Sequence, residues 1–405
     1  MEKILIICGG IHQIPLIKKA KELGFYVINS NLYENSPAFP FADETVVLDV
    51  LDVEGNYLYA QSHQVKGIVS DQSELSVKTV AEVSERLGLQ TITLQNATLF
   101  TDKYDMRDFC KKHGFSHPAY CKCSSLKEVK DYFQMTKKKS IMKPLDSFSS
   151  RGVIIVENLS NLEEIFELSR SYSRDKTSVI IEDYLEGTEF TIDALVLDGK
   201  VFNLAISEKE HFLHNQSIAC TLNFSYQNSN FDYDALRNLN RKLLEKTNLS
   251  FGLTHCEYKY TNGEFVLIEM AARGGGAYIA SKIVPYLSGV DNYAYYLKFA
   301  MNMPLPYNYD SMIEKAIVKN RNRVASLRFF DFDSAGKAVR EIHGVEKITS
   351  CKNILHFELN FKEGDVIQKA IDDSTRCGYY IVAAENRNDL KSCIAFVENT
   401  LKIIY

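Results

Sequence analysis

The sequence predicts an α/β and α+β protein that begins with a doubly wound parallel sheet. Strands alternate with helical patterns over the first hundred residues, antiparallel strand patterns follow, and short strands with one long helix close the chain. The predicted parts are residues 1–100, 101–310 and 311–405, with a small lobe at about 115–186 inside the second part. A chain of 405 residues is long enough for such a division.

The N-terminal part is predicted from short apolar runs, each followed by a stretch with helical spacing. The expected strands are KILIIC, YVINSN, DETVVLDV and VKGIVSD. The expected helices, HQIPLIKKAKELG and ELSVKTVAEVSERLG, end at Gly24 and Gly88. Ligands of parallel sheets bind beyond the carboxyl ends of the strands, where the CGGIHQ turn lies. Its two glycines, Gly9 and Gly10, equally suit an ordinary tight turn.

The middle and C-terminal parts lack the regular alternation of strands and helices that predicts the N-terminal sheet. TDKYDMRDFCKKHG predicts a helix, and Ser160 with Glu163 predicts a capping box at the start of the next helix. Antiparallel strands follow, with Asp198 and Gly199 at a hairpin turn, and a helix is expected at about 233–247. The tail is expected to return to short strands and to end in a helix through NDLKSCIAFVENTLKII.

The composition excludes several classes of function. Charged residues make up 24% of the chain and hydrophobic residues 45%, and the net charge of −5 is spread without long runs of one sign. No nucleic-acid or membrane partner is therefore indicated. No apolar run is long enough for a membrane span or a signal peptide. Among nine cysteines, the close pair Cys121 and Cys123 fits neither a zinc nor a thioredoxin spacing, so we expect reduced thiols in a cytoplasmic protein.

Two glutamates, Glu257 and Glu269, lie on opposite arms of the hairpin THCEYKYTNGEFVLIEM. Because side chains alternate along a strand, the two share a face only if the loop holds an odd number of residues. A three-residue loop of Thr261, Asn262 and Gly263 meets this condition, whereas a two-residue Asn-Gly turn separates the glutamates. If they converge, Mg²⁺ offsets their repulsion and substrate phosphates supply further ligands. The alternative is that both face solvent.

The end of that hairpin, LIEMAARGGGAY, combines an arginine with three glycines ahead of an apparent helix. Gly274, Gly275 and Gly276 let backbone N–H groups approach a ligand, and a helix N-terminus favours an anion. Arg273 offers a fork suited to phosphate or carboxylate. A turn that serves packing alone is the alternative.

The loop DSFSSRG is small and rich in hydroxyl groups, and it follows a strand that carries Lys143. Its N–H and O–H groups can fold over phosphates that Lys143 also reaches. It is not a Walker A loop, because no G-K-[ST] closes it. The alternative is a polar hairpin.

These motifs, in this order, resemble the ATP-grasp superfamily of carboxylate–amine ligases over nearly the whole chain. The matching segments are TDKYDMR, IMKPLDSFSSRGV, IIEDYLEGTEFTIDA, HCEYKY and LIEMAARGGG. The resemblance implies a pre-ATP-grasp α/β domain, then two subdomains that clamp ATP between antiparallel sheets. EMAARGGG, THCE and the small C-terminal domain resemble the branch that includes bacterial L-amino-acid ligases. GGIHQIPLIKKAKELG also resembles purine-biosynthesis and carbamoyl-phosphate-type members.

The resemblance also implies roles for individual residues. The expected ATP contacts are Lys103, Lys143, Ser149, Ser150, Gly152, Glu182, Asp183, Tyr184, Leu185 and Glu189. The expected Mg²⁺ ligands are Glu257 and Glu269, and the expected catalytic groups are Arg273 and Lys143. The expected substrate wall is His255, Lys209, His211, His214, Arg273, Gly274, Gly275 and Gly276, although an ordinary exposed loop is the alternative for the histidines at 211 and 214. Ala271 replaces an Asn that ligates metal in many members, so one or two Mg²⁺ ions, or Mn²⁺ in their place, are expected.

The implied activity is amide formation. A carboxylate attacks the γ-phosphate of ATP to give an acyl-phosphate and ADP, and an amine then displaces phosphate. An amino acid or a similar small molecule is the expected substrate. Two alternatives remain at this point: a bicarbonate-activating enzyme of the purine-biosynthesis or carbamoyl-phosphate type, and a non-catalytic ATP-binding protein. Many relatives dimerise, so a homodimer is a further expectation.

Overall fold

The N-terminal part forms the predicted parallel sheet. The computed structural model describes residues 1–147, 150–174 and 176–405. Its N-terminal sheet has the strand order β3-β2-β1-β4, with every pair parallel. The strands are β1 (Lys3–Ile7), β2 (Tyr26–Asn31), β3 (Glu44–Val47) and β4 (Gly67–Val69). The strand order reverses between β1 and β4, so the loops after these two strands flank the switch point where ligands bind.

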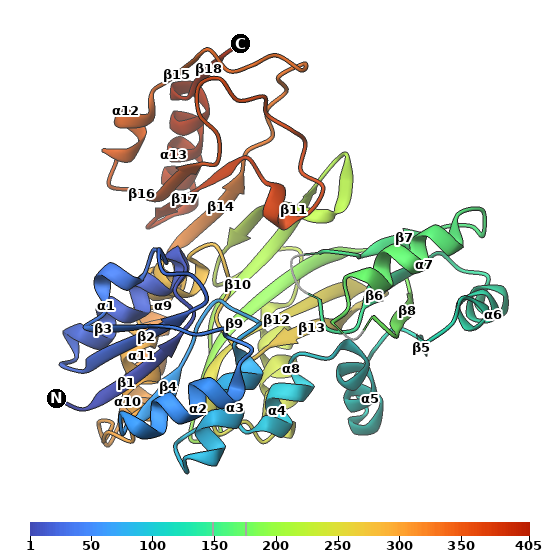
Figure 1. The fold of residues 1–405 in the computed structure, drawn as a ribbon. Helices are drawn as coiled ribbons and strands as arrows, with labels where there is room; N and C mark the ends of the chain where they lie inside the picture. The colour runs from blue at the N-terminus through green and yellow to red at the C-terminus, as the bar shows by residue number, and fades with distance from the viewer. Residues whose placement is uncertain (148–149, 175) are drawn as a thin grey trace.

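Helices cover both faces of the N-terminal sheet (Figure 1). Ile4 and Ile6 of β1 share an apolar core with α1 and α10. The alternating residues Leu5 and Ile7 share another with α2 and α3. These helices are α1 (Ile14–Glu22), α2 (Val53–Ser62), α3 (Val77–Arg86) and α10 (Asn292–Ala300). Because α10 comes from the middle of the chain, the sheet is tied to the part that follows it.

A small antiparallel sheet, β5-β8-β6-β7, forms a separate lobe with its own core. Its elements are β5 (Tyr120–Cys123), α6 (Leu126–Thr136), β6 (Ser140–Pro144), β7 (Ile154–Val156), α7 (Leu162–Ser171) and β8 (Val179–Asp183). Two helices, α4 (Leu94–Leu99) and α5 (Lys103–His113), lead into it.

The capping box predicted at Ser160 is wrong. Helix α7 begins at Leu162, and Asn161 precedes it without a side-chain cap. The carboxamide of Asn158 accepts a hydrogen bond from the Ser160 N–H at 2.9 Å, so Ser160 belongs to a turn ahead of the helix.

A large antiparallel sheet of eight strands runs through the rest of the molecule, in the order β13-β12-β9-β10-β11-β14-β17-β16. Its strands are β9 (Thr188–Leu197), β10 (Lys200–Phe212), β11 (Asn215–Phe224), β12 (Phe251–Thr261), β13 (Glu264–Ala271), β14 (Val324–Phe329), β16 (Ile354–Leu359) and β17 (Gly378–Ala384). Helix α8 (Tyr233–Lys246) packs against it. Asp198 and Gly199 form the predicted two-residue turn, with φ of +51° and +73°.

The C-terminal strands β14, β17 and β16 continue the large sheet, so the C-terminal part is joined to the middle part by strand pairing (Figure 1). The remaining elements are α9 (Val284–Ser288), α11 (Tyr309–Lys319), β15 (Glu341–His343), α12 (Val345–Thr349), α13 (Arg387–Thr400) and β18 (Lys402–Ile404). The tail therefore starts with a helix, where short strands were predicted. The final helix stops at Thr400, because the last residues pair with β15. None of the described helices combines the length and apolar character that a bilayer crossing requires.

Candidate active site

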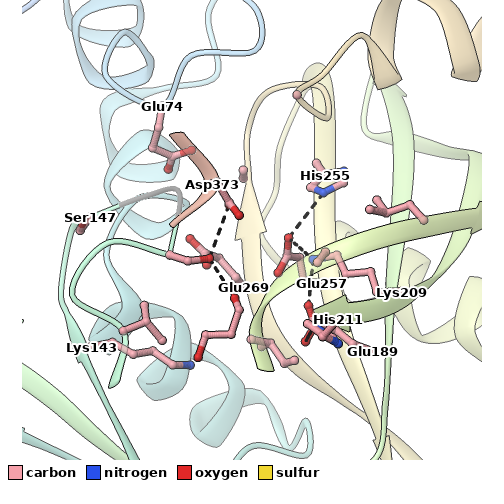
Figure 2. Close-up of a pocket in the computed structure, with 18 of the residues that line it drawn as sticks. Glu74, Lys143, Ser147, Glu189, Lys209, His211, His255, Glu257, Glu269 and Asp373 are labelled. Atoms are coloured by element: carbon pink, nitrogen blue, oxygen red, sulfur yellow. Dashed lines mark hydrogen bonds and ion pairs between the residues drawn. The ribbon is translucent and has the colours of Figure 1, made fainter. Parts of the chain in front are cut away.

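A cavity of about 580 Å³ lies where the small sheet, the large sheet and the N-terminal sheet meet. The small lobe contributes Lys143, and the large sheet contributes Glu257 and Glu269 (Figure 2). Glu74 comes from the loop after β4, at the switch point of the N-terminal sheet, and Asp373 comes from the C-terminal part. Residues from every part of the chain therefore line one polar space.

The paired glutamates face this cavity together, but not by the predicted route. The hairpin turn is the two-residue Asn262-Gly263 turn, since Thr261 pairs with Glu264, so it is the alternative that was expected to separate the two glutamates. A β-bulge between Glu257 and Tyr258 then shifts the register. The shift leaves Ile268 unpaired and sets Glu257 opposite Glu269, on the same face of the sheet.

A buried arginine supports the bulge. Arg107 of α5 donates from Nη2 to the Ile268 carbonyl oxygen at 2.5 Å, and its Nε donates to Glu182 at 2.6 Å. Lys143 Nζ donates to the other oxygen of Glu182 at 2.7 Å. Glu182 is 1% exposed; burial alone would raise its pKa, but Arg107 and Lys143 outweigh that effect and lower the pKa to about 2.

Each paired glutamate also contacts a lysine. Lys103 Nζ lies 3.0 Å from Glu269 Oε1 and donates to the Ser147 carbonyl at 2.8 Å. Lys209 Nζ lies 2.8 Å from Glu257 Oε1. Burial opposes ionisation of Glu257, yet Lys209 and His255 hold the pKa of this carboxyl well below its usual range. Each of the two glutamates therefore accepts from a lysine at the cavity wall.

Lys209 bridges two acids. Its Nζ lies 2.8 Å from Glu189 as well as from Glu257, and His211 Nε2 lies 3.4 Å from Glu189 Oε2 (Figure 2). His211 lines the cavity, but His214 is not among the lining residues. His214 Nε2 instead lies 3.0 Å from the Ala370 carbonyl oxygen, so the substrate-wall expectation for His214 is wrong.

His255 sits between two carboxylates. Its Nδ1 is 2.9 Å from Asp193 Oδ1, and its Nε2 is 3.6 Å from Glu257 Oε1. Burial lowers the pKa of His255, but Asp193 and Glu257 raise it more, to about 9. The imidazolium therefore shares in fixing the position of Glu257.

Two of the three glycine N–H groups are used inside the protein, so the expectation that they face a ligand is wrong. Gly274 N donates to Asp71 Oδ1 at 2.7 Å, and Gly275 N donates to Asp193 Oδ1 at 3.1 Å. Only Gly276 of the three is among the cavity-lining residues that the structure describes. The following segment, Ile279–Ile283, is one π-helical turn ahead of α9. The backbone N–H groups of Gly274 and Gly275 thus hold the end of β13 next to Asp71 and Asp193.

Arg273 lines the cavity and pairs with an acid from the N-terminal part. Its Nε lies 3.0 Å from Glu74 Oε2, and its Nη1 donates to the Gly274 carbonyl at 3.0 Å. Neither Glu74 nor Asp71 was predicted. Asp71 is the last residue of the predicted strand VKGIVSD and Glu74 follows it, at a carboxyl end of the parallel sheet, so their position in the sequence was the available signal.

The loop after Lys143 lies partly outside the described residues, and Ser149 is among those outside. Ser150 donates to the Ser217 carbonyl at 3.2 Å and lies 3.5 Å from Asp373 Oδ2, so the loop end reaches across the cavity to the C-terminal part. Gly152 is not a lining residue; it has φ of +70° and packs against Pro144 and Tyr172. The expected adenine segment does line the cavity: Glu182, Asp183, Tyr184 and Leu185.

Two segments of the chain match known domain families. Residues 136–281 match the ATP-grasp domain family, and residues 328–405 match L-amino acid ligase C-terminal domain 2. The chain therefore contains an ATP-grasp domain and a C-terminal domain of the L-amino acid ligase type.

Individual relatives agree with this assignment. An L-arginine-specific L-amino acid ligase of Bacillus subtilis is 20% identical over 337 residues, which are 81% of this chain and 78% of that protein. A formate-dependent phosphoribosylglycinamide formyltransferase of Erythrobacter litoralis (strain HTCC2594) is 27% identical over 187 residues, 45% of this chain and 48% of that protein, so that match spans about half the relative. The crystal structure of an L-amino acid ligase from Bacillus licheniformis superposes with a TM-score of 0.83 at 19% identity, covering 100% of this chain and 99% of that one.

Proposed function

We propose that the protein joins a small carboxylic acid, an amino acid or a similar molecule, to an amine through an acyl-phosphate, with ATP converted to ADP and phosphate. The carrying observation is the placement of Glu257 and Glu269 on one face of a hairpin, in the same cavity as Arg273 and Lys143. The C-terminal domain match favours the L-amino acid ligase branch over the other ATP-grasp branches.

The donor set suits Mg²⁺. The structure shows no group of three or more His, Cys, Asp or Glu side chains among its described residues that could hold a metal. Two carboxylates with phosphate oxygens completing the shell are nevertheless a usual way to hold Mg²⁺. Glu257 and Glu269 would hold one ion, and a second ion has fewer protein ligands because Ala271 has no donor side chain. Bound there, Mg²⁺ supplies charge neutralisation for the transferring phosphoryl group.

The chain's own residues would position the reactants. Lys103 and Lys143 are the proposed phosphate contacts, and each has only to exchange its present glutamate contact for a phosphate oxygen. Arg273 is already oriented by Glu74 and the Gly274 carbonyl, so its remaining N–H groups can meet the developing charge. The Ser147–Gly152 loop would exclude water from the acyl-phosphate.

The division of the chain is also a proposal. We retain residues 1–100 as the first part and about 115–186 as the small lobe. The boundary at residue 310 would cut α11 (Tyr309–Lys319), which contacts α9 and β10, so we place the start of the third part after that helix.

The test is Mg²⁺-dependent ADP release from ATP across free amino acids, singly and in pairs, with formate and bicarbonate in separate wells. We expect release that requires both an acid and an amine, with an amide detected by mass spectrometry. ADP release with formate or bicarbonate as the acid would instead favour a second candidate function, the activation of a one-carbon acid as in purine biosynthesis. The similarity to a formate-dependent formyltransferase points to this alternative. Bound ATP without release in any well would overturn the ligase proposal.

A further inference from the structure

Glu358 differs from the other acids of the cavity because it has no lysine or arginine partner. Among the described residues, every other carboxylate that lines the cavity lies within 4.0 Å of a lysine or arginine nitrogen. These pairs are Glu74–Arg273, Glu182–Arg107, Asp183–Lys138, Glu189–Lys209, Glu257–Lys209, Glu269–Lys103 and Asp373–Arg376. The described side chains that contact Glu358, on β16, are His356 and the hydroxyl of Tyr379, and neither is a lysine or an arginine. A carboxylate that lines a cavity and has no lysine or arginine partner is stabilised when a cationic group of a ligand binds to it.

The histidine does not neutralise this acid. Lys282 Nζ lies 3.4 Å from His356 Nδ1, and an ammonium can only donate, so Nδ1 is the acceptor. The other nitrogen, Nε2, then carries the hydrogen and donates to Glu358 Oε2 at 3.0 Å. Burial lowers the pKa of His356, and this outweighs the opposing effect of Glu358. The imidazole is thus a neutral donor that brings no positive charge to Glu358.

Aromatic rings stand beside the free charge. Tyr379 is the cross-strand neighbour of Glu358 and lines the cavity with it. The His356 ring is 5.0 Å from the Tyr379 ring and 4.4 Å from the Tyr278 ring, and the His12 ring is 4.8 Å from Tyr278. His12 also lines the cavity, from the loop after β1. Lys282 Nζ already lies 4.7 Å from the centre of the Tyr278 ring, so Tyr379 and His12 are the rings left beside this acid. A carboxylate with aromatic rings near it is a combination that attracts an organic cation.

This corner is separate from the residues proposed for ATP. Glu358 and Tyr379 lie on β16 and β17 of the C-terminal part, and His12 lies at the switch point of the N-terminal sheet. None of the proposed ATP contacts comes from these segments. A cation at Glu358 would therefore occupy the cavity together with the nucleotide.

We propose that Glu358, with Tyr379 and His12 beside it, binds the ammonium or guanidinium group of a substrate, so that the ligase acts on a cationic amino compound. This inference rests on the proposed function. The bound group is not the attacking amine, because a nucleophilic amine must be unprotonated. It is either the α-ammonium of an amino acid or the charged end of a basic side chain.

The test is calorimetric binding to the full chain in the presence of Mg²⁺ and ADP. The probes are L-lysine, L-norleucine, 6-aminohexanoate and hexanoate. We expect L-lysine to bind at least about tenfold more tightly than hexanoate, as a charged hydrogen bond predicts. 6-Aminohexanoate carries only the terminal ammonium, so its tight binding together with weak binding of norleucine would identify the side-chain cation as the bound group. Norleucine carries only the α-ammonium, so tight binding of norleucine with weak binding of 6-aminohexanoate would identify the α-ammonium.

Variants locate the site. Glu358→Gln should weaken L-lysine binding about tenfold or more and leave hexanoate unchanged, whereas the exposed loop residue Glu363, changed to Gln, serves as the matched control. The melting temperature and MgADP binding of each variant report its folding. Should Glu358→Gln not fold, the comparison of charged and uncharged probes on the unaltered chain still decides.

Either equal binding of hexanoate and lysine, no binding of any probe, or unchanged lysine binding in Glu358→Gln would overturn the inference. These results are distinguishable from failure of the proposed function. Amide formation from neutral amino acids that is insensitive to Glu358→Gln would leave the ligase standing without this site. Lysine binding that depends on Glu358, without ADP release under any pairing of substrates, would support this binding site and overturn the proposed ligase function.

Discussion

Lys103 and Lys209 each contact one of the two cavity glutamates. Two carboxylates on directly opposed residues repel, and each lysine offsets the repulsion by contacting one of them at 3.0 and 2.8 Å, respectively. The same lysines are long and can turn toward phosphate oxygens when a metal takes over the carboxylates.

Glu269→Gln should abolish turnover while leaving nucleotide binding largely intact. The variant keeps the shape of the side chain but loses the charge that faces the metal, and charge neutralisation at a phosphoryl group is worth several kcal/mol. We expect Mg²⁺-dependent ADP release to fall about 100-fold or more. Glu264→Gln, at the far end of the same strand, is the control. Near-normal turnover in Glu269→Gln would remove Glu269 from the metal site.

Arg273→Lys should lower kcat/KM about 100-fold, as loss of a donor to developing charge does in other enzymes. Lysine cannot bond Glu74 and the Gly274 carbonyl while presenting further donors, as the guanidinium does. Steady-state kinetics at saturating MgATP measures the effect. Unchanged kinetics would show that Arg273 serves only to hold Glu74.

At the scale of elements, the β12–β13 hairpin shows what a sequence can and cannot specify. The sequence predicted the two strands, and it included the Asn262-Gly263 turn as one of two possible turns. Glu257 and Glu269 share a face of the sheet. The β-bulge that brings the two glutamates onto one face could not be predicted from the sequence. It leaves Ile268 without a strand partner, and the Ile268 carbonyl oxygen accepts a hydrogen bond from Arg107, which lies on α5, far away in the chain. Tertiary contacts that bend a strand leave no local pattern.

The glycines after this hairpin differ in what they tolerate. A Cβ at Gly275 would lie 2.9 Å from both Asp193 Oδ1 and His255 Nδ1, whereas a Cβ at Gly276 meets no atom within 4 Å. Gly275→Ala should therefore lower the free energy of unfolding by about 1–3 kcal/mol. Gly276→Ala should stay within about 0.5 kcal/mol of the unaltered chain. Denaturant unfolding compares the two, and equal effects would contradict the packing role assigned to Gly275.

At the scale of the whole molecule, the parts are joined by elements that cross the predicted boundaries. Helix α10 covers the N-terminal sheet, and strand β14 extends the large sheet into the C-terminal part. Sequence patterns indicated the strands and helices of each part, but not these pairings, because partners far apart in the chain carry no shared periodicity. The same crossings bring Glu74 and Asp373 into a cavity whose predicted residues came from the middle part.

Acid should weaken the whole fold through Glu182. Because its folded-state pKa is depressed from 4.5 to about 2, its contribution to stability is present above pH 4.5 and is lost as the pH falls toward 2. The pKa difference corresponds to about 3 kcal/mol. Glu182→Gln leaves Arg107 and Lys143 without a counter-charge and should cost about 3–5 kcal/mol at neutral pH.

The measurement is the free energy of unfolding from pH 6 down to pH 3 for the unaltered chain and Glu182→Gln. The unaltered chain should lose stability more steeply, because the variant has no carboxylate to protonate at this position. Parallel curves would show that Glu182 does not stabilise the lobe through its charge.

The central claim is that a carboxylate oxygen of the substrate attacks the γ-phosphate of ATP. The most direct measurement uses a substrate acid labelled with ¹⁸O in its carboxylate, together with the amine that supports ADP release, and mass spectrometry of the phosphate formed. The mechanism predicts one ¹⁸O transferred to each released phosphate and one retained in the amide. Amide formation with ¹⁸O-free phosphate, or with ¹⁸O in AMP and release of pyrophosphate, would contradict the acyl-phosphate mechanism.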